Sequence, residues 1–340
     1  MADAVDVRRR LILGAALLGP AAINGKAHAQ ARAARSPRVP LRKLEPLRHV
    51  ETDLLNIARH ESGPATGAAV ILLHGFPYDI HTYADVAPIL AARGCRVIVP
   101  YLRGYGETRF RDNATPRSGE QAALGADVIA LLDAFGIKRA VLAGHNWGGR
   151  AATVAAALWP DRCAGLVTVN SYLIQDLARA MTPAAPENEE AMWYEYYFQL
   201  ERGRAGLAAN RRRIARMLWE EWSPDWDFDD ATFNRSMPAL DNPDFVDVAV
   251  HSYRHRFGNA DGDPRYAELE KRLAAMPPIA VPAVTLDGDK DGVVAAGDGS
   301  ASAGKFTARR IHRVVKGAGH NIPQEAPEAF AGAVMELVKA

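Results

Sequence analysis

The chain has 340 residues, of which 48% are hydrophobic and 24% charged, and its formal net charge at pH 7 is +1. This composition is typical of an ordinary globular protein and suits one large α/β core with an insertion. With so little net charge, neither nucleic acid nor an anionic membrane surface is an expected partner.

Residues 1–29 are predicted to form a twin-arginine-type signal peptide. Arg8, Arg9 and Arg10 precede a short apolar run, and Ala27-His28-Ala29 fits a small-x-small cleavage site. We therefore expect a periplasmic or secreted protein, with no stable membrane association after cleavage near Ala29. A disordered tail and an uncleaved anchor are the alternatives. Residues 30–48, rich in Ala, Arg and Pro, are expected to be a linker.

Strand-like and helix-like patterns alternate along residues 49–172 and again along residues 279–340. Such alternation predicts an α/β fold with a mostly parallel central sheet flanked by helices, in which ligands bind at the carboxyl ends of the strands. An edge hairpin is expected at residues 49–59. The predicted strands are residues 68–73, 96–99, 139–143, 165–170, 280–286 and 309–315, and the predicted helices are residues 83–93, 120–135, 150–158 and 327–338.

The alternation stops between residues 173 and 278, where the sequence is helical in pattern and rich in Trp and Tyr. This segment is expected to be a helical cap inserted into the core. The two cysteines, Cys95 and Cys163, each begin an apolar run, which favours core packing over a disulfide. No Cys/His spacing indicates a metal site.

The segment Gly144–Gly149 lies between a predicted strand and a predicted helix, with Asn146 at its centre. It resembles the nucleophile elbow of the α/β-hydrolases, in which small residues permit a sharp turn. The central residue of that motif is normally Ser, Cys or Asp. A neutral amide is a poor nucleophile, so the scaffold is that of a hydrolase whose first chemical step lacks its usual group.

Further candidates follow other strands, in the chain order nucleophile, acid, histidine. His320 follows the last predicted strand, and three aspartates follow the strand before it: Asp287, Asp289 and Asp291. Asp291 best fits the expected position of the acid, and Asp289 is the competing candidate. The turn after residues 68–73 is expected to supply the N–H of Phe76 to an oxyanion hole, which the N–H of Trp147 completes.

His74-Gly75-Phe76-Pro77, Arg103-Gly104-Tyr105-Gly106 and Gly144-His145-Asn146-Trp147-Gly148-Gly149 together resemble the epoxide hydrolase and haloalkane dehalogenase branch of the superfamily. The resemblance implies an Asp nucleophile that forms an alkyl-enzyme ester, and a His-activated water that hydrolyses this ester. It also places two epoxide-holding tyrosines in the cap, at Tyr194 and Tyr253. Plain cap packing is the alternative role for both. Tyr196 and Tyr197 are fallback positions, and Phe76, Trp147 and Tyr197 are expected to contact the substrate.

These expectations describe an enzyme that converts a small apolar epoxide to a vicinal diol without cofactor or metal. Asn146 implies that the activity is impaired, or that Asn146 is converted to Asp by the water that His320 activates. A non-catalytic ligand-binding relative and a dehalogenase are the alternatives. Dehalogenation is disfavoured because Glu195 and Tyr196 stand where fluoroacetate dehalogenases have His and Trp, and because Phe76 has no side-chain donor for halide. The sequence contains no signal for an oligomeric state.

Overall fold

The structure, a computed structural model, describes residues 42–339. The predicted signal peptide and most of the predicted linker lie outside these residues. The strands are β1 (Leu47–Glu51), β2 (Leu55–Ser62), β3 (Ala69–Leu73), β4 (Arg96–Pro100), β5 (Arg109–Phe110), β6 (Ala140–Gly144), β7 (Cys163–Val169), β8 (Ala283–Gly288) and β9 (Arg310–Val315).

The helices are α1 (Val86–Ala92), α2 (Gln121–Ala134), α3 (Asn146–Leu158), α4 (Pro186–Ala191), α5 (Trp193–Tyr197), α6 (Glu201–Trp222), α7 (Asp230–Ser236), α8 (Phe245–Arg256), α9 (Ala267–Ala274), α10 (Ile322–Glu325) and α11 (Pro327–Val338). Short 3-10 turns lie at η1 (Ile80–Tyr83), η2 (Pro160–Arg162), η3 (Leu177–Arg179), η4 (Met237–Asp241), η5 (Pro264–Tyr266) and η6 (Ser300–Lys305).

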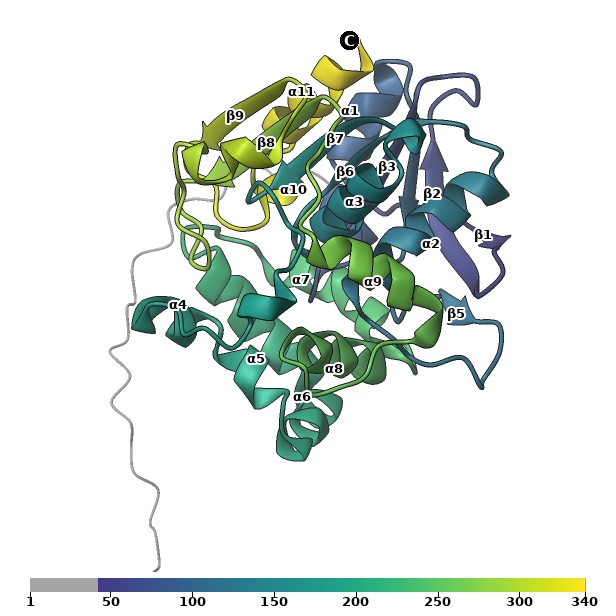
Figure 1. Ribbon diagram of the computed structural model, residues 1–340. Coiled ribbons are helices and arrows are strands. Elements are labelled where there is room, and N and C mark those ends of the chain that lie inside the picture. Colours follow the sequence, from purple (N-terminus) through teal and green to yellow (C-terminus); the bar gives the residue numbers. More distant parts are fainter. Residues whose placement is uncertain (1–41, 340) are drawn as a thin grey trace, which may run out of the picture. The chain divides into compact units, whose positions relative to one another are not determined.

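The strands form one sheet in the order β1-β2-β4-β3-β6-β7-β8-β9, with β5 added to β2. All pairs from β4 to β9 are parallel, whereas β1 and β2 form the predicted antiparallel edge hairpin. Helices α2 and α3 cover one face of the sheet, and α1 and α11 cover the other (Figure 1). The predicted α/β-hydrolase fold class is therefore confirmed.

Several boundaries differ from the predicted ones by a few residues, and two of these differences have local reasons. Strand β8 begins at Ala283 rather than at residue 280, because Pro282 has no N–H to donate to the sheet. Helix α3 begins at Asn146 rather than at residue 150, so the elbow residue itself belongs to the first helical turn. At its carboxyl end, β6 thus passes almost directly into α3.

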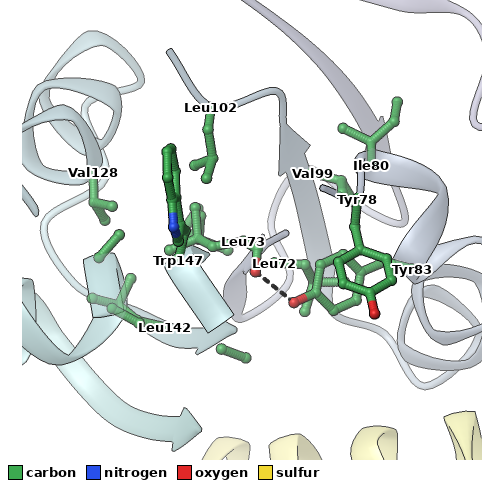
Figure 2. Packing of buried hydrophobic residues seen from close by; sticks show 14 of the residues in the cluster. Leu72, Leu73, Tyr78, Ile80, Tyr83, Val99, Leu102, Val128, Leu142 and Trp147 are labelled. Carbon is green, nitrogen blue, oxygen red and sulfur yellow. Dashed lines mark hydrogen bonds between the residues drawn. The ribbon is translucent and has the colours of Figure 1, made fainter. Parts of the chain in front are cut away.

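The central strands are buried on both faces, as their continuous apolar sequences require. Leu72 and Leu73 of β3 pack between Leu142 of β6 and the aromatic residues of the η1 region (Figure 2). The Tyr83 hydroxyl donates a 2.6 Å hydrogen bond to the Leu73 carbonyl at the end of β3. The end of β3, from which the oxyanion turn departs, is therefore fixed by both packing and hydrogen bonding.

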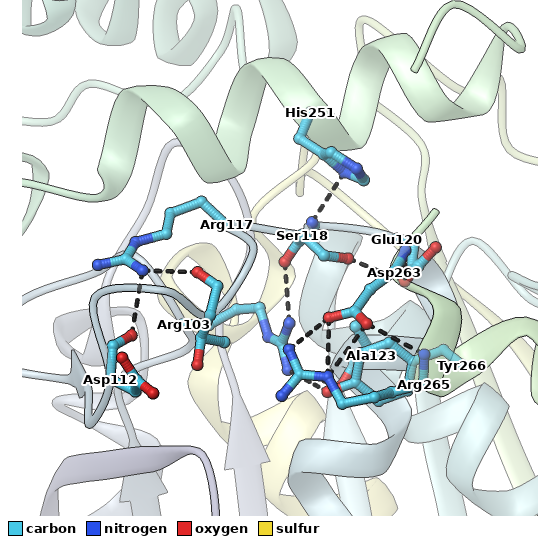
Figure 3. A network of polar contacts seen from close by, with 12 residues as sticks. Arg103, Asp112, Arg117, Ser118, Glu120, Ala123, His251, Asp263, Arg265 and Tyr266 are labelled. Carbon is cyan, nitrogen blue, oxygen red and sulfur yellow. Dashed lines mark hydrogen bonds and ion pairs between the residues drawn. The ribbon is translucent and has the colours of Figure 1, made fainter. Parts of the chain in front are cut away.

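Helices α4 to α9 lie between β7 and β8 in the sequence and gather along one end of the sheet (Figure 1). A buried polar network joins them to the loop after β4 (Figure 3). The Arg103 guanidinium bonds to Asp127 at 2.7 Å and to the Tyr266 hydroxyl at 3.0 Å, and Glu120 accepts from the N–H of Asp263 at 3.0 Å. A charged side chain in this position is stable only because it is fully paired.

The two cysteines are buried and unpaired, as expected for core residues. Within residues 42–339 there is no helix with the length and hydrophobicity that a membrane span requires.

Candidate active site

The elbow places Asn146 in a strained backbone conformation at the start of α3. Its φ angle is +53°, in the left-handed region that side chains other than glycine rarely adopt. Gly148 makes the turn possible, because a Cβ at that position would lie 1.9 Å from the Leu73 carbonyl oxygen of β3. The helix can therefore pack tightly against the sheet and present residue 146 at its edge.

Two backbone N–H groups bind the side-chain oxygen of Asn146. Phe76 donates at 3.1 Å and Trp147 donates at 2.6 Å, both to Oδ1. These are the two donors that the sequence predicted for an oxyanion hole. The amide oxygen lies where the oxygen of an acyl or tetrahedral group on residue 146 would lie.

The turn that carries Phe76 is held by His74. Its Nδ1 donates to the Gly75 carbonyl at 3.0 Å, and its Nε2 accepts from the N–H of Leu102 at 3.1 Å. Burial lowers the pKa of His74 to about 4, so the ring is neutral and this pair of bonds fixes its tautomer. Gly75 is required beside it, since a Cβ there would lie 2.5 Å from the Cβ of Asn146.

His320 and Asp291 extend from Asn146 as one hydrogen-bonded chain. The Nδ2 of Asn146 donates to Nε2 of His320 at 3.0 Å, and Nδ1 of His320 donates to Oδ2 of Asp291 at 2.9 Å. The orientation of the Asn146 amide is consistent throughout, because its oxygen faces only donors and its nitrogen faces an acceptor. The ring of His320 therefore presents an unprotonated nitrogen to residue 146.

The Asp291 carboxylate is buried and ionised. Burial opposes ionisation, but the facing His320 and the N–H groups of Val294 and Val293 hold its pKa below the usual value for an aspartate. Such a carboxylate orients the histidine ring and stabilises the imidazolium that forms when His320 accepts a proton.

The structure separates the three candidate aspartates. Only Asp291 reaches His320. Asp289 accepts from the N–H of Gly317 at 2.6 Å and faces Lys316, and Asp287 accepts from the N–H of Gly297 at 3.0 Å. These two carboxylates therefore stabilise the neighbouring loops and lie outside the chain that begins at Asn146.

Several supporting contacts around His320 were not predicted. Asn170 donates to Oδ2 of Asp291 at 3.1 Å, and the Trp222 ring lies 5.1 Å from the His320 ring. The backbone N–H of His320 donates to Oγ of Ser223 at 3.1 Å, and Ser223 in turn donates to Glu325 at 2.7 Å. The cap thus helps to position the histidine, through a contact that joins residues about a hundred positions apart.

Tyr194 of α5 and Tyr253 of α8 meet above the oxyanion turn. Their ring centroids are 5.4 Å apart, and those of Tyr253 and Phe76 are 5.3 Å apart. The Tyr253 ring also lies 5.7 Å from that of Trp147. Burial raises the pKa of both tyrosines well above the usual value, so each phenol keeps its proton and can donate it.

Tyr196 and Tyr197, the fallback positions, lie elsewhere. Tyr196 is exposed and contacts Phe257 and Glu189. The Tyr197 ring packs against Trp193 and Phe198, and its hydroxyl fills the space beside Gly206. Among the described ring contacts, none joins Tyr197 directly to Phe76 or Trp147, and the substrate contact through Tyr197 stays a prediction.

One group of residues outside this site has metal-ligating atoms close together. Glu120, His255 and Glu270 place such atoms within 4.8 Å of one another. One oxygen of each glutamate already accepts a backbone hydrogen bond, Glu120 from the N–H of Asp263 and Glu270 from the N–H of Ala122. The other oxygen of Glu120 faces Nε2 of His255 at 3.3 Å. In this structure the group connects α8 and α9 to the start of α2.

Comparison with known proteins agrees with this architecture. The sequence matches the alpha/beta hydrolase fold family over residues 68–327. It is 46% identical to a candidate epoxide hydrolase of known structure from Klebsiella pneumoniae, with a TM-score of 0.85 and coverage of 86% of this chain and 97% of the other. Epoxide hydrolase A of Mycobacterium tuberculosis is 26% identical over 319 residues, which are 86% of this chain and 96% of that protein.

A shorter match joins the chain to epoxide hydrolase B of the same organism, at 33% identity over 153 residues. That alignment spans 40% of this chain and 41% of the relative, so the chain matches about two fifths of the length of this curated protein. The family match covers well over half of the chain and includes the elbow, the oxyanion turn and the histidine. The chain belongs to the alpha/beta hydrolase family and has epoxide hydrolases among its homologues.

Proposed function

We propose that this protein is an epoxide hydrolase-type enzyme that adds water to a small epoxide and releases a vicinal diol. The observation that carries the proposal is the continuous chain of bonds from the N–H groups of Phe76 and Trp147, through the side chain of residue 146, to His320 and Asp291. Two buried phenols, Tyr194 and Tyr253, lie on the cap side of these hydrogen-bonded groups.

Each group has a role in that reaction. A carboxylate at position 146 would attack a ring carbon and break one ring C–O bond, while a tyrosine gives its proton to the departing oxygen. Water would then attack Cγ of residue 146, His320 would take the water proton, and the N–H groups of Phe76 and Trp147 would bind the oxyanion. Breaking the acyl C–O bond then leaves an acid at residue 146 and a protonated His320. Their two protons go to the departing oxygen and to the tyrosinate, so the diol leaves and the carboxylate, histidine and tyrosine are restored.

Asn146 limits the first step, because a neutral amide cannot deliver the attacking oxygen. We propose that epoxide hydrolysis by this chain is weak or appears slowly, as hydrolysis of the Asn146 amide supplies the carboxylate. The geometry favours such conversion, since the amide oxygen already accepts two N–H bonds and the amide nitrogen, which must leave, faces His320 at 3.0 Å.

This conversion predicts a change in mass that appears together with the activity. Protein stored at neutral pH should gain about one dalton at residue 146, measured by peptide mass spectrometry, while diol formation from an epoxide panel rises in proportion. The variant His320→Gln should gain neither. If residue 146 stays Asn and no epoxide is opened during storage, the proposed conversion of Asn146 to Asp is wrong.

A non-catalytic ligand-binding relative is the second candidate function. The observation that favours it is Asn146 itself, which retains the shape of an aspartate without its charge. Saturable binding of epoxides with no turnover, even after Asn146→Asp, would support this candidate. The hydrogen bond between His320 and Asp291 favours an enzymatic function over a binding function. A binding protein does not need a group that accepts protons. A dehalogenase is less favoured, since Phe76 has no side-chain donor for halide.

The cap tyrosines provide a test of the leaving-group step. In an Asn146→Asp background, Tyr194→Phe and Tyr253→Phe should each lower the rate of epoxide opening roughly a hundredfold, because each removes a donor to the developing alkoxide. The exposed Tyr196 supplies the matched control, and Tyr196→Phe should leave the rate unchanged. Stopped-flow measurement of single turnovers would check this. Equal rates of epoxide opening in all three variants would show that Tyr194 and Tyr253 do not protonate the leaving oxygen.

We also propose export of the protein to the periplasm or the cell exterior. The support is confined to the sequence of residues 1–29, with its paired arginines and its small-x-small site before Gln30.

A further inference from the structure

Arg150 is a charged residue that the reaction described above does not use. It follows Asn146 by four positions on α3, so the two side chains leave the same face of the helix about 6 Å apart along its axis. Two nitrogens of its guanidinium, Nε and Nη1, are completely buried and have no hydrogen-bond partner. Among residues 42–339, Arg150 forms neither a side-chain hydrogen bond nor an ion pair with any acid.

The charges that act on Arg150 come from two cap helices. Arg256 of α8, which is partly buried, and Glu195 of α5, which is buried, form an ion pair, and the Arg256 guanidinium lies 5.0 Å from the centre of the Tyr253 ring. Both tyrosines and Glu195 interact electrostatically with Arg150, as does Arg256. The single carboxylate of Glu195 neutralises Arg256, so the group as a whole retains one positive charge.

Arg150 as a whole is partly buried, but burying two donors of a cation without a partner is costly, and proteins normally pair such a group. Burial, followed by repulsion from Arg256, lowers the pKa of Arg150 to about 9. The guanidinium is still protonated at neutral pH, and an anion beside it would relieve both effects. The two unused donors of Arg150 therefore belong to a group of side chains whose positive charge this part of the chain does not balance.

We infer that Arg150 binds a carboxylate group of the substrate, so that the epoxide opened at residue 146 is a short epoxy acid. The planar guanidinium offers paired N–H donors that match the two oxygens of a carboxylate. Because Arg150 lies only one helical turn from Asn146, the carboxylate must be attached close to the oxirane ring. The aromatic rings of Phe76, Trp147 and Tyr253 would then surround the small apolar part of the molecule.

The inference rests on the proposed function for its epoxide and on Arg150 for its carboxylate, and binding measurements separate the two. The chain as it stands, with Asn146, would be titrated by calorimetry with oxirane-2-carboxylate and with oxirane-2-carboxamide, which share a skeleton and differ in charge. We expect the carboxylate to bind at least about tenfold more tightly than the amide.

Three variants make the comparison specific. Arg150→Met should lower the affinity for the carboxylate about tenfold or more and leave that for the carboxamide within about twofold, whereas Arg150→Lys should restore part of the loss. The exposed Arg213 of α6 supplies a matched loss of charge, and Arg213→Met should change neither affinity. Thermal unfolding of each variant would establish that it is folded.

Different results would overturn different parts. Equal affinities for the two probes, or an Arg150→Met variant that binds the carboxylate normally, would refute the role of Arg150. Full competition by chloride or inorganic phosphate would show a general anion site and also refute a substrate-specific one. If Asn146→Asp opens the carboxamide epoxide as fast as the acid, the proposed function stands and this inference fails. If the acid binds through Arg150 but neither epoxide is opened by Asn146→Asp, the proposed function fails instead.

Discussion

Asn146→Asp is expected to raise the rate of epoxide opening by about four powers of ten or more, because it supplies the negative charge that nucleophilic attack requires. The site is already arranged for a carboxylate. One oxygen would accept the N–H bonds of Phe76 and Trp147. The other would replace the Nδ2 atom, would no longer donate to His320, and would be available to attack the epoxide. The backbone at this position, with φ of +53°, is one that Asp and Asn adopt more readily than other residues.

The measurement is diol formation from a panel of neutral and acidic epoxides, with the chain as it stands and the Asp variant side by side. Asn146→Ala provides the control, because it cannot be converted to a carboxylate. Freshly made protein with Asn146 should form diol no faster than the Ala variant. Any diol formation above that of the Ala variant would measure the fraction of protein converted to Asp. An Asp variant that opens no member of the panel would refute the enzyme proposal.

A second large effect is expected when the hydrolytic step is blocked after the nucleophile has been restored. In the double variant Asn146→Asp, His320→Gln, the carboxylate can still attack the epoxide, but no base activates water at Cγ. The ester should therefore persist about a thousandfold longer than in Asn146→Asp alone. Intact-mass analysis should show one substrate mass added per chain, located by peptide mapping at residue 146.

The single variant Asn146→Asp is the control for this experiment, since its ester should turn over and not accumulate. His320→Gln in the unaltered chain is a second control and should form no adduct, because Asn146 does not attack. Normal turnover in the double variant would show that His320 is not the base. An adduct at a residue other than 146 would show that the elbow is not the nucleophile.

Much of the site could be expected from the sequence because its members follow strands. Asn146 and Phe76 follow the buried strands β6 and β3, and His320 follows the edge strand β9. The carboxyl ends of parallel strands meet at one edge of a sheet. Local chemistry marked these positions as well, since Gly75 and Gly148 are required where backbone and side chains approach within the radius of a Cβ. Order along the chain was therefore enough to assemble the candidates.

Other choices depended on the direction of individual side chains. Asp289 and Asp291 lie in the same turn, and only the fold directs one toward Lys316 and the other toward His320. In α5, Tyr194 is buried near Phe76 while Tyr196 is exposed, because residues two positions apart on a helix point to nearly opposite sides. An aromatic-rich segment does not reveal which of its rings faces inward.

Arg150 is the clearest case in which sequence was insufficient. In the sequence it is an ordinary arginine in a helix, a position usually exposed and solvated. Its surroundings come from Glu195 and Arg256, which lie 45 and 106 positions further along the chain and on different helices. The excess of positive charge arises only from residues on α3, α5 and α8 together, so no single segment of the sequence reveals it.

The sequence by itself determined the fold class, the elbow with its Asn146, and the order of the groups along the sheet edge, because these depend on local patterns of apolar, small and turn-forming residues. The tertiary structure decided which aspartate and which tyrosines reach the site, and left Arg150 without a counter-charge. Those outcomes depend on packing between distant segments and on burial, which sets the free energy of a charge and has no local signature in the chain.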